Sequence, residues 1–450
     1  MGASQSALES FQDPGPAVTQ ERIVRAIKSY ENTDKVDNVV VEKVADSEKG
    51  EGFTSTLESV KVGAMVDGVN KSYAWVVKSM PRDPNRALMS LAYKADEREA
   101  IFYGDLLPQV RKFLCSKEMS DLMPMICSVP YSAWDKDDKV LIMEDLKVDG
   151  WRDAINKKAG LDIEHTRVAI RWLARFHAIT YAFLEQYKDG VEQAKKDMPL
   201  FFWKYDDHFN FEQESAAFRE MTNDSQRAIF KGLEEKNPGR NYSKYLEDLI
   251  TEHLDMANAA NKVKDSQDYK LLTLCHHDPW FNNMMFKYKD DGHVDEIILI
   301  DFQIPSYASP ALDISFFLSS STTGPLRTKY LPHILTLYHT VFADTVQRLG
   351  VSLDFSYEDL LEDFRKANLH GLSFALTALP TILAESKEDM FDPEEWMKAL
   401  NEEDEEVKKK KLKEITDQQS NNYHSSDAIG ERVRDLVDEW IDSGVFAHNI

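Results

Sequence analysis

A polar segment between two short apolar runs carries the residue types that phosphoryl transfer from ATP requires. Residues 275–283 read CHHDPWFNN, so Asp278 lies five positions before Asn283. A second aspartate, Asp301, directly follows the apolar run 297–300. In kinases one carboxylate accepts the proton of the substrate hydroxyl, while an amide oxygen and a further carboxylate bind Mg²⁺. Because H-x-D-x-x-x-x-N is also the pattern of the kinase catalytic loop, this segment predicts a kinase.

Each residue of this group has an expected role. Asp278 is the candidate general base, and Asn283 and Asp301 are the candidate ligands of Mg²⁺, an ion that prefers hard oxygen donors. A single aspartate in a turn would more simply hydrogen-bond its own backbone. The combination of three such residues favours the catalytic interpretation. We expect His276 to brace the loop through backbone hydrogen bonds and Asn282 to be structural.

A lysine and a glutamate upstream are candidates for positioning the phosphates of ATP. Lys78 ends an apolar, strand-like run, where a single lysine is usually a surface residue. A kinase, however, needs a strand lysine that pairs with a helix glutamate. Glu99 is the best partner, with Glu97 on a different helix face as second choice. Gly50 and Gly52 lie where a glycine-rich loop could cover the phosphates, with a plain hairpin turn as the alternative.

The elements that must position these residues follow from hydrophobic periodicity and turn residues. Strand-like segments are 36–44, 53–66, 73–78, 129–134, 140–143, 271–274, 284–288 and 297–300. Helix-like segments are 23–30, 94–107, 167–183, 402–411 and 433–441. Pro108 should end the second of these helices. The charged segment 402–411 predicts a solvated helix with ion pairs one turn apart.

The order of the elements predicts an α+β fold of three segments. Residues 1–35 form an arm and a helix, and 36–145 form a nucleotide-binding lobe with a small mixed sheet and one helix. Residues 146–450 form a larger, mostly helical lobe with the catalytic loop and the acceptor site. At the boundary we expect the backbone of Glu144 and Leu146 to meet the adenine, with a simple interlobe linker as the alternative.

The composition excludes several classes of function. A net charge of −24 argues against nucleic-acid binding, which requires Lys and Arg patches. An acidic surface would attract cations, including Mg²⁺ and cationic substrates. The three cysteines are too few and too scattered for a disulfide framework or a zinc site, which predicts a reducing compartment. We expect a cytoplasmic protein.

The sequence gives little sign of a membrane protein. No apolar run approaches the roughly 18–20 residues that span a bilayer, and the N-terminus lacks the apolar region of a signal peptide. Residues 1–6 fit the loose pattern for myristoylation at Gly2, but a start codon followed by small polar residues explains them as well. No polybasic segment follows, and one acyl chain gives only reversible association. We therefore expect no stable membrane insertion.

At these residues the chain resembles the ecdysteroid kinase-like family (CHK kinase-like), a branch near the choline and aminoglycoside kinases. The matching stretches are 73–81, 99–103, 107–108, 141–146, 173–178, 276–283, 300–303 and 309–313, within a likeness that runs from about residue 35 to the end. The resemblance implies a bilobal protein-kinase-like fold. It also implies ATP-dependent phosphorylation of a hydroxyl on a small alcohol, such as an ecdysteroid or another lipophilic polyol. By match to the motif, Asp278 resembles the base, and Asn283 and Asp301 the metal ligands. Lys78 and Glu99 resemble the pair that positions the phosphates, and Asp313 resembles a brace of the helical lobe.

Two departures leave alternatives open. The family usually has Gly and Leu where this chain has His277 and Pro279, which bears more on substrate geometry and rate than on ATP binding. One alternative is a kinase of the choline or aminoglycoside type that acts on a cationic alcohol. Another is a catalytically silent nucleotide-binding module. Aromatic residues at 201–203 and 205 are candidates for the acceptor pocket, with core packing as the other explanation.

Overall fold

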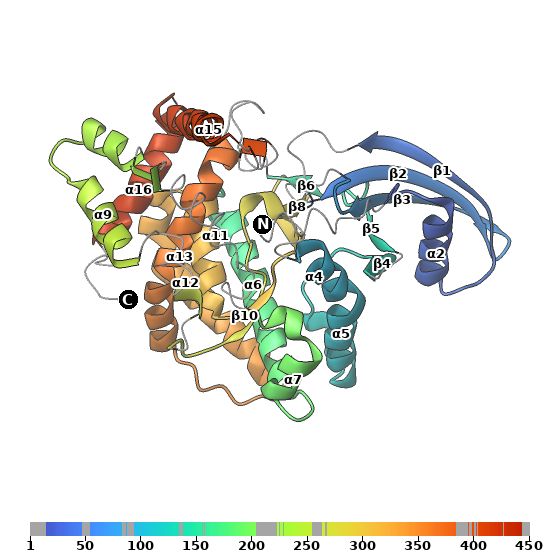
Figure 1. Ribbon diagram of the computed structural model, residues 1–450. Coiled ribbons are helices and arrows are strands. Elements are labelled where there is room, and N and C mark those ends of the chain that lie inside the picture. Colours follow the sequence, from blue (N-terminus) through green and yellow to red (C-terminus); the bar gives the residue numbers. More distant parts are fainter. Residues whose placement is uncertain are drawn as a thin grey trace.

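The computed structural model shows an α+β fold, in which a five-stranded antiparallel sheet with helices is followed by a mostly helical region (Figure 1). This confirms the predicted fold class. The described residues are 15–46, 55–82, 87, 94–134, 138–154, 156, 158–203, 223–224, 226–227, 229–253, 263–265, 268–383, 395, 398–399, 402, 404–425 and 427–442. Gly2, Gly50, Gly52 and Tyr205 lie outside these residues.

The strands of the N-terminal sheet follow the order β1-β2-β3-β5-β4. Their bounds are β1 (Val36–Asp46), β2 (Thr56–Val66), β3 (Val69–Ser79), β4 (Tyr131–Trp134) and β5 (Lys139–Glu144). The expected mixed sheet is wrong, because β2–β3 and β4–β5 are hairpins and β5 also returns antiparallel to β3. Between β2 and β3, Asp67 and Gly68 both have positive φ, as a tight two-residue hairpin requires. Lys78 on β3 pairs with Leu57 and Leu141, so it lies inside the sheet.

Helix α2 (Gln20–Glu31) precedes the sheet and packs on it, as predicted from the apolar spacing. It begins where Thr19 Oγ1 accepts a hydrogen bond from the N–H of Arg22 and ends at Asn32, which has a left-handed conformation. Ile23 and Ile27 lie one turn apart and are fully buried in a cluster with valines of β2. Figure 1 shows α2 beside the sheet, away from the helical region.

The helix predicted over 94–107 continues past Pro108, so that the expected stop is wrong. It is made of α4 (Ala95–Ile101), the π-helix η1 (Phe102–Leu106) and α5 (Leu107–Ser116). In the π-turn the N–H of Leu107 donates to the oxygen of Phe102, five residues back. Pro108 then lies in the first turn of α5, where a helix tolerates proline best. Gly104 of the π-turn lies close to β4, since an added Cβ would stand 3.3 Å from Ser132 Oγ.

The helical region encloses two small groups of strands. Its long helices are α6 (Ile163–Glu185), α9 (Tyr242–His253), α11 (Pro310–Ser321), α12 (Gly324–Arg348), α13 (Tyr357–Leu383), α15 (Glu405–Ser425) and α16 (Asp427–Asp442), with a shorter α7 (Val191–Asp197). The strands are β6 (Arg152–Asp153), β7 (Thr273–Cys275), β8 (Met284–Tyr288), β9 (Val294–Leu299) and β10 (Ser306–Ala308). The connection between β7 and β8 is the predicted catalytic loop.

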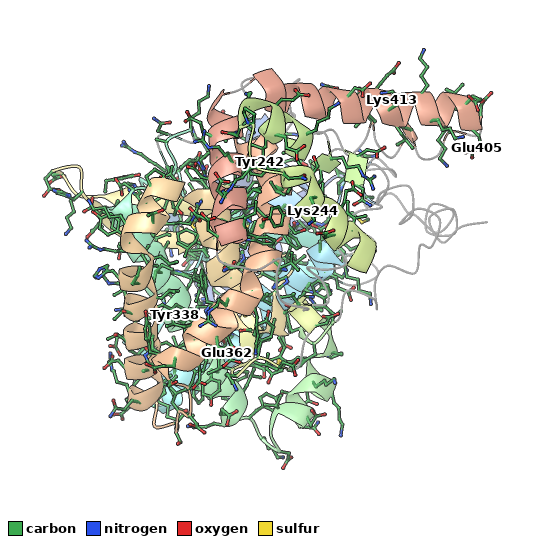
Figure 2. All side chains as sticks on the ribbon, turned by 90° about the vertical axis from the view of Figure 1, so that its left-hand side faces the viewer. Tyr242, Lys244, Tyr338, Glu362, Glu405 and Lys413 are labelled. Carbon is green, nitrogen blue, oxygen red and sulfur yellow. The ribbon has the colours of Figure 1, made fainter. Side chains whose placement is uncertain are left out.

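The core of the helical region surrounds α6 and α11. The predicted stripe on α6 is buried, from Trp172 to Phe183, and α11 is buried on every side. By contrast, α15 extends away from the rest of the chain (Figure 2), and at its start Lys408 Nζ lies 3.9 Å from Glu405 Oε1, one turn earlier. The prediction of a solvated helix there is confirmed. No helix in the described ranges is long and apolar enough to cross a membrane.

Candidate active site

The loop between β7 and β8 brings the candidate base to the first candidate metal ligand. Asn283 Nδ2 donates to Asp278 Oδ2 at 2.8 Å and to the backbone oxygen of Asp278 at 3.0 Å. The N–H of Ile300 donates to the backbone oxygen of Asn283 at 3.0 Å, which holds the end of β9, just before Asp301, against the loop. Three residues selected from the sequence are therefore grouped in space.

The oxygen atoms of this group fit a divalent cation. Burial, and then the negative charge of Asp301, raise the pKa of Asp278 well above its usual range. Two carboxylates whose charges disfavour one another are stabilised by a bound Mg²⁺, which takes a few carboxylate or amide oxygens and completes its shell with phosphates. Asp301 also has a left-handed backbone with φ +69, a conformation that is uncommon for residues other than glycine. The donor set thus suits magnesium held between protein and nucleotide.

The predicted pairing of Lys78 with Glu99 is present. Lys78 Nζ lies 2.6 Å from Glu99 Oε2 and 2.5 Å from Asp301 Oδ1. Burial lowers the pKa of Lys78, but the charges of Asp301 and Glu99 outweigh this effect and raise it overall. The partner of Lys78 on α4 is thus Glu99, the first choice, and not Glu97. A buried cation between two carboxylates links β3, α4 and the residue after β9.

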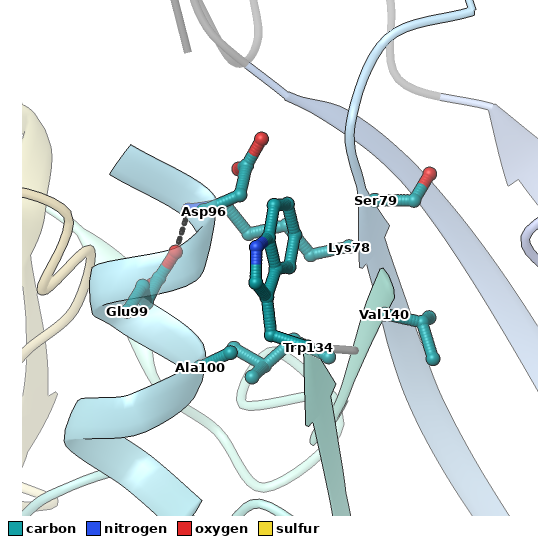
Figure 3. Close-up of a pocket in the computed structure, with 8 residues that line it drawn as sticks. Lys78, Ser79, Asp96, Glu99, Ala100, Trp134 and Val140 are labelled. Carbon is teal, nitrogen blue, oxygen red and sulfur yellow. Dashed lines mark ion pairs between the residues drawn. The ribbon is translucent and has the colours of Figure 1, made fainter. Parts of the chain in front are cut away.

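A cavity adjoins this ion pair. Lys78, Glu99 and Trp134 line it, together with neighbouring residues of β3, α4 and β5 (Figure 3). Figure 3 shows the side chain of Trp134, from β4, rising between α4 and the end of β3. The cavity therefore lies between α4 and strands β3, β4 and β5.

The expected hinge follows β5 directly. The N–H of Asp145 donates to the oxygen of Ala74 at 3.0 Å, and the N–H of Trp151 donates to the oxygen of Leu146 at 3.1 Å. Within the described part of the chain the N–H of Leu146 makes no backbone hydrogen bond, and its side chain packs in a small apolar cluster. The carboxylate of Glu144 accepts from Tyr30 of α2 at 2.7 Å. The N–H of Glu144 donates to the backbone oxygen of Ser128 at 3.0 Å, so it already has a partner within the protein.

His276 braces the loop, as predicted. The N–H of Asp278 donates to His276 Nδ1 at 3.3 Å, which leaves Nε2 to donate to the oxygen of Ile300 at 3.0 Å. Burial lowers the pKa of His276, in keeping with a neutral ring. The ring also packs on Phe302 at 4.4 Å between centroids, and Phe302 stacks on Phe102 at 3.9 Å. This stack joins the loop, the segment after β9 and the helix that carries Glu99.

Sequence reasoning missed a buried network around Gln303. Gln303 Nε2 donates to Ser55 Oγ at 2.9 Å and lies 3.3 Å from Asp96 Oδ1, while Ser55 Oγ donates to the same Asp96 oxygen at 2.6 Å. The network connects the start of β2, the first turn of α4 and the residue two positions after Asp301. The one signal in the sequence was the position of Gln303 directly after Asp301-Phe302.

Replacing Gln303 by leucine should destabilise the protein and weaken the binding of Mg·ATP together. The buried Ser55 and Asp96 would lose a donor, which typically costs about 1–3 kcal/mol, and α4 would lose a link to Asp301. Urea unfolding and calorimetric titration with Mg·ATP would measure the two effects. Gln109→Leu, which removes a surface amide on α5, is the matched control. Full nucleotide affinity in a destabilised Gln303→Leu protein would show that the network only stabilises the fold.

Asp313 holds the backbone of the catalytic loop from α11. Ser309 and Pro310 begin that helix, which places Asp313 in its first turn. Asp313 Oδ2 accepts from the N–H of His276 at 2.8 Å, and Oδ1 accepts from the N–H of His277 at 2.9 Å. These bonds agree with the bracing role that the resemblance implied.

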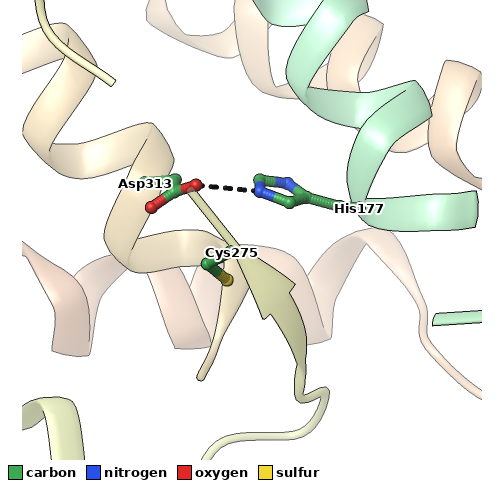
Figure 4. Close-up of side chains that lie close together, drawn as sticks. All are labelled: His177, Cys275 and Asp313. Carbon is green, nitrogen blue, oxygen red and sulfur yellow. Dashed lines mark hydrogen bonds and ion pairs between the residues drawn. The ribbon is translucent and has the colours of Figure 1, made fainter. Parts of the chain in front are cut away.

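His177, Cys275 and Asp313 lie close enough together to resemble a metal site (Figure 4). His177 Nε2 lies 3.0 Å from Asp313 Oδ2, and its Nδ1 lies 2.9 Å from the hydroxyl of Tyr338. The thiol of Cys275 donates to the oxygen of Ala308 at 3.4 Å. Because all three side chains already have protein partners, we interpret the cluster as a structural brace.

The catalytic loop keeps its backbone hydrogen bonds despite the two departures from the family pattern, His277 and Pro279. After Pro279, the N–H of Trp280 donates to the oxygen of Asp278 at 3.0 Å, and the N–H of Asn283 donates to the oxygen of Trp280 at 2.9 Å. The loop therefore does not depend on an N–H at position 279. His277 has a left-handed φ of +71, a conformation that favours glycine.

Of the aromatic residues at 201–203, Phe201 belongs to the core and Trp203 lies beside the catalytic loop. Phe201 is fully buried in the main core, as the alternative explanation held, and Phe202 packs on Tyr307 at 4.9 Å between ring centroids. Trp203 lies beside the catalytic loop, with its ring 6.2 Å from that of His277.

Comparison with known proteins gives one result. The model of the ecdysteroid kinase-like family matches residues 49–351, a shorter span than the likeness expected from the motifs. The match includes the loop and the ion pair and ends before α13. No curated protein matches the chain. The family is one of small-molecule kinases with a protein-kinase-like fold. This chain belongs to the ecdysteroid kinase-like family.

Proposed function

We propose that this protein is an ATP-dependent kinase that phosphorylates a hydroxyl of a small alcohol, an ecdysteroid or another lipophilic polyol. The observation that carries the proposal is the Lys78 ion pair. One ammonium group contacts both Glu99, from α4, and Asp301, beside the catalytic loop. The pair of lysine and helix glutamate has to be in place in an active kinase, because the glutamate aims the lysine at the phosphates of ATP.

Each residue then has a defined task. Lys78 would hold the α- and β-phosphates of ATP, with Glu99 aiming its side chain. Asp301 and Asn283 would hold Mg²⁺, which neutralises phosphate charge during transfer. Asp278 would orient the acceptor hydroxyl and accept its proton. We assign the nucleotide to the N-terminal sheet and the hinge backbone at Glu144 and Leu146, and the acceptor to the helical lobe.

Two observations favour this proposal over its alternatives. A silent nucleotide-binding module would not need the base, the two metal ligands and the ion pair together in one site. The match to the ecdysteroid kinase-like family supports a lipophilic polyol over a cationic alcohol. We also propose a cytoplasmic location, which suits the free thiols of Cys115, Cys127 and Cys275.

The test is a phosphotransfer assay on the purified full chain. Protein, Mg²⁺ and ATP are incubated with a panel of ecdysteroids, other polyhydroxylated steroids, choline and an aminoglycoside, and mass spectrometry detects a phosphate added to any acceptor. A phosphorylated steroid is the expected result. A phosphorylated cation would keep the reaction and replace the substrate class. ATP binding without any modified acceptor would favour the silent module.

A further inference from the structure

His277 carries two unfavourable features at one position, directly before the candidate base. Its φ of +71 lies in the left-handed region, where a residue with a Cβ is strained. Its side chain is only 2% exposed, yet among the described residues neither of its buried ring nitrogens has a hydrogen-bond partner. A buried polar group without a partner is unfavourable and rare in folded proteins.

The ring of His277 lies beside two aromatic rings from outside the catalytic loop. Its centroid lies 5.2 Å from that of His370 on α13 and 6.2 Å from that of Trp203, which meets it edge-on. The backbone N–H of His277 is fixed by Asp313 at 2.9 Å. Burial, and next the charge of Lys264, lower the pKa of the ring well below its usual range. The ring is therefore neutral, with one donor and one acceptor nitrogen.

Packing alone does not explain a histidine here. Glycine would remove the backbone strain, and an apolar ring would fill the same space without unpaired nitrogens. Strain and unpaired polar atoms that persist together beside catalytic residues are typical of positions whose function requires them. No residue in the described part of the chain supplies a hydrogen-bond partner for the imidazole.

We propose that His277 determines acceptor specificity by hydrogen-bonding a second hydroxyl of a polyol, close to the hydroxyl that is phosphorylated. A hydroxyl both donates and accepts, so it can pair with either nitrogen of a neutral imidazole, whereas a quaternary ammonium group can do neither. This inference rests on the proposed kinase function and narrows its substrate class to alcohols with neighbouring hydroxyls.

The experiment compares wild type, His277→Gly and His277→Asn. Glycine fits the left-handed backbone but lacks the ring, and asparagine tolerates that backbone while keeping a donor and an acceptor. The acceptors are an ecdysteroid with adjacent ring hydroxyls and its deoxy counterpart that lacks one of them. KM and kcat are measured for each acceptor at saturating Mg·ATP, with the ATP dissociation constant and the melting temperature alongside.

We expect His277→Gly to melt at a higher temperature than wild type and to bind ATP unchanged. Its KM for the diol should rise roughly tenfold or more, as for one lost buried hydrogen bond, so that diol and deoxy acceptor become alike. His277→Asn should recover part of the difference. Glu118→Gly is the matched control, because it relieves a left-handed φ of +57 at an exposed site and should leave acceptor kinetics unchanged.

Two results would overturn the inference, and they can be told apart. If wild type is active and His277→Gly still distinguishes diol from deoxy acceptor as well as wild type does, the ring is only a packing element. If wild type phosphorylates no member of the panel, the proposed kinase function fails and the acceptor role fails with it.

Discussion

Asp278→Asn should lower the turnover number by roughly 10²–10⁴-fold, the usual contribution of a general base. The amide has nearly the same shape as the carboxylate, but it cannot accept the proton of the acceptor hydroxyl. Asn283 contacts both the side chain and the backbone of Asp278, so the loop should keep its form. The initial rate of acceptor phosphorylation at saturating Mg·ATP is the measurement.

The same substitution should not destabilise the free protein. The pKa of Asp278 is raised by burial and by Asp301, which means that the folded state disfavours its charge. A neutral amide removes that unfavourable charge, so urea unfolding without Mg²⁺ should show equal or greater stability. Asp295→Asn, an exposed change on neighbouring β9, is the matched control for both measurements. Full activity of Asp278→Asn would refute its role as the base.

The residues that the sequence predicted best are those whose spacing is local. Asp278 and Asn283 lie within one short loop, and Asp301 follows the strand that returns beside it. Lys78 and Glu99 are more distant, yet strand and helix signals indicated where each would lie. To predict their positions it was enough to predict the strand and the helix that carry them. For this reason the group could be selected before its contacts were known.

The rest depended on geometry that single residues do not reveal. The π-turn before Pro108 was missed because proline usually ends a helix, and only the hydrogen-bond shift at Phe102 lets it continue. The network of Gln303 with Ser55 and Asp96 joins residues far apart in the chain. The left-handed backbone of His277 is a property of the folded loop and cannot be read from its residue type.

Asp313→Asn should give one of the largest losses of stability of any conservative change in this protein. Its carboxylate is 1% exposed and accepts from two backbone N–H groups of the catalytic loop, besides its contact with His177. An amide places N–H donors where an oxygen now accepts, so at least one backbone N–H would be left buried without a partner. Since a hydrogen bond to a charged group contributes about 1.5–3 kcal/mol, we expect a loss of roughly 3 kcal/mol in urea unfolding.

Tyr338→Phe tests the contribution of His177 to this brace separately from that of Asp313. It removes only the hydroxyl that contacts His177 Nδ1 at 2.9 Å, and it leaves the bonds from Asp313 to the loop intact. We expect a loss of about 1 kcal/mol and nearly unchanged turnover, whereas Asp313→Asn should lose stability and turnover together. Equal losses of stability and turnover in the two variants would mean that His177, rather than the carboxylate of Asp313, holds the loop. An active and stable Asp313→Asn protein would show that the neighbouring bonds of His276 and Asn283 are enough to position the base.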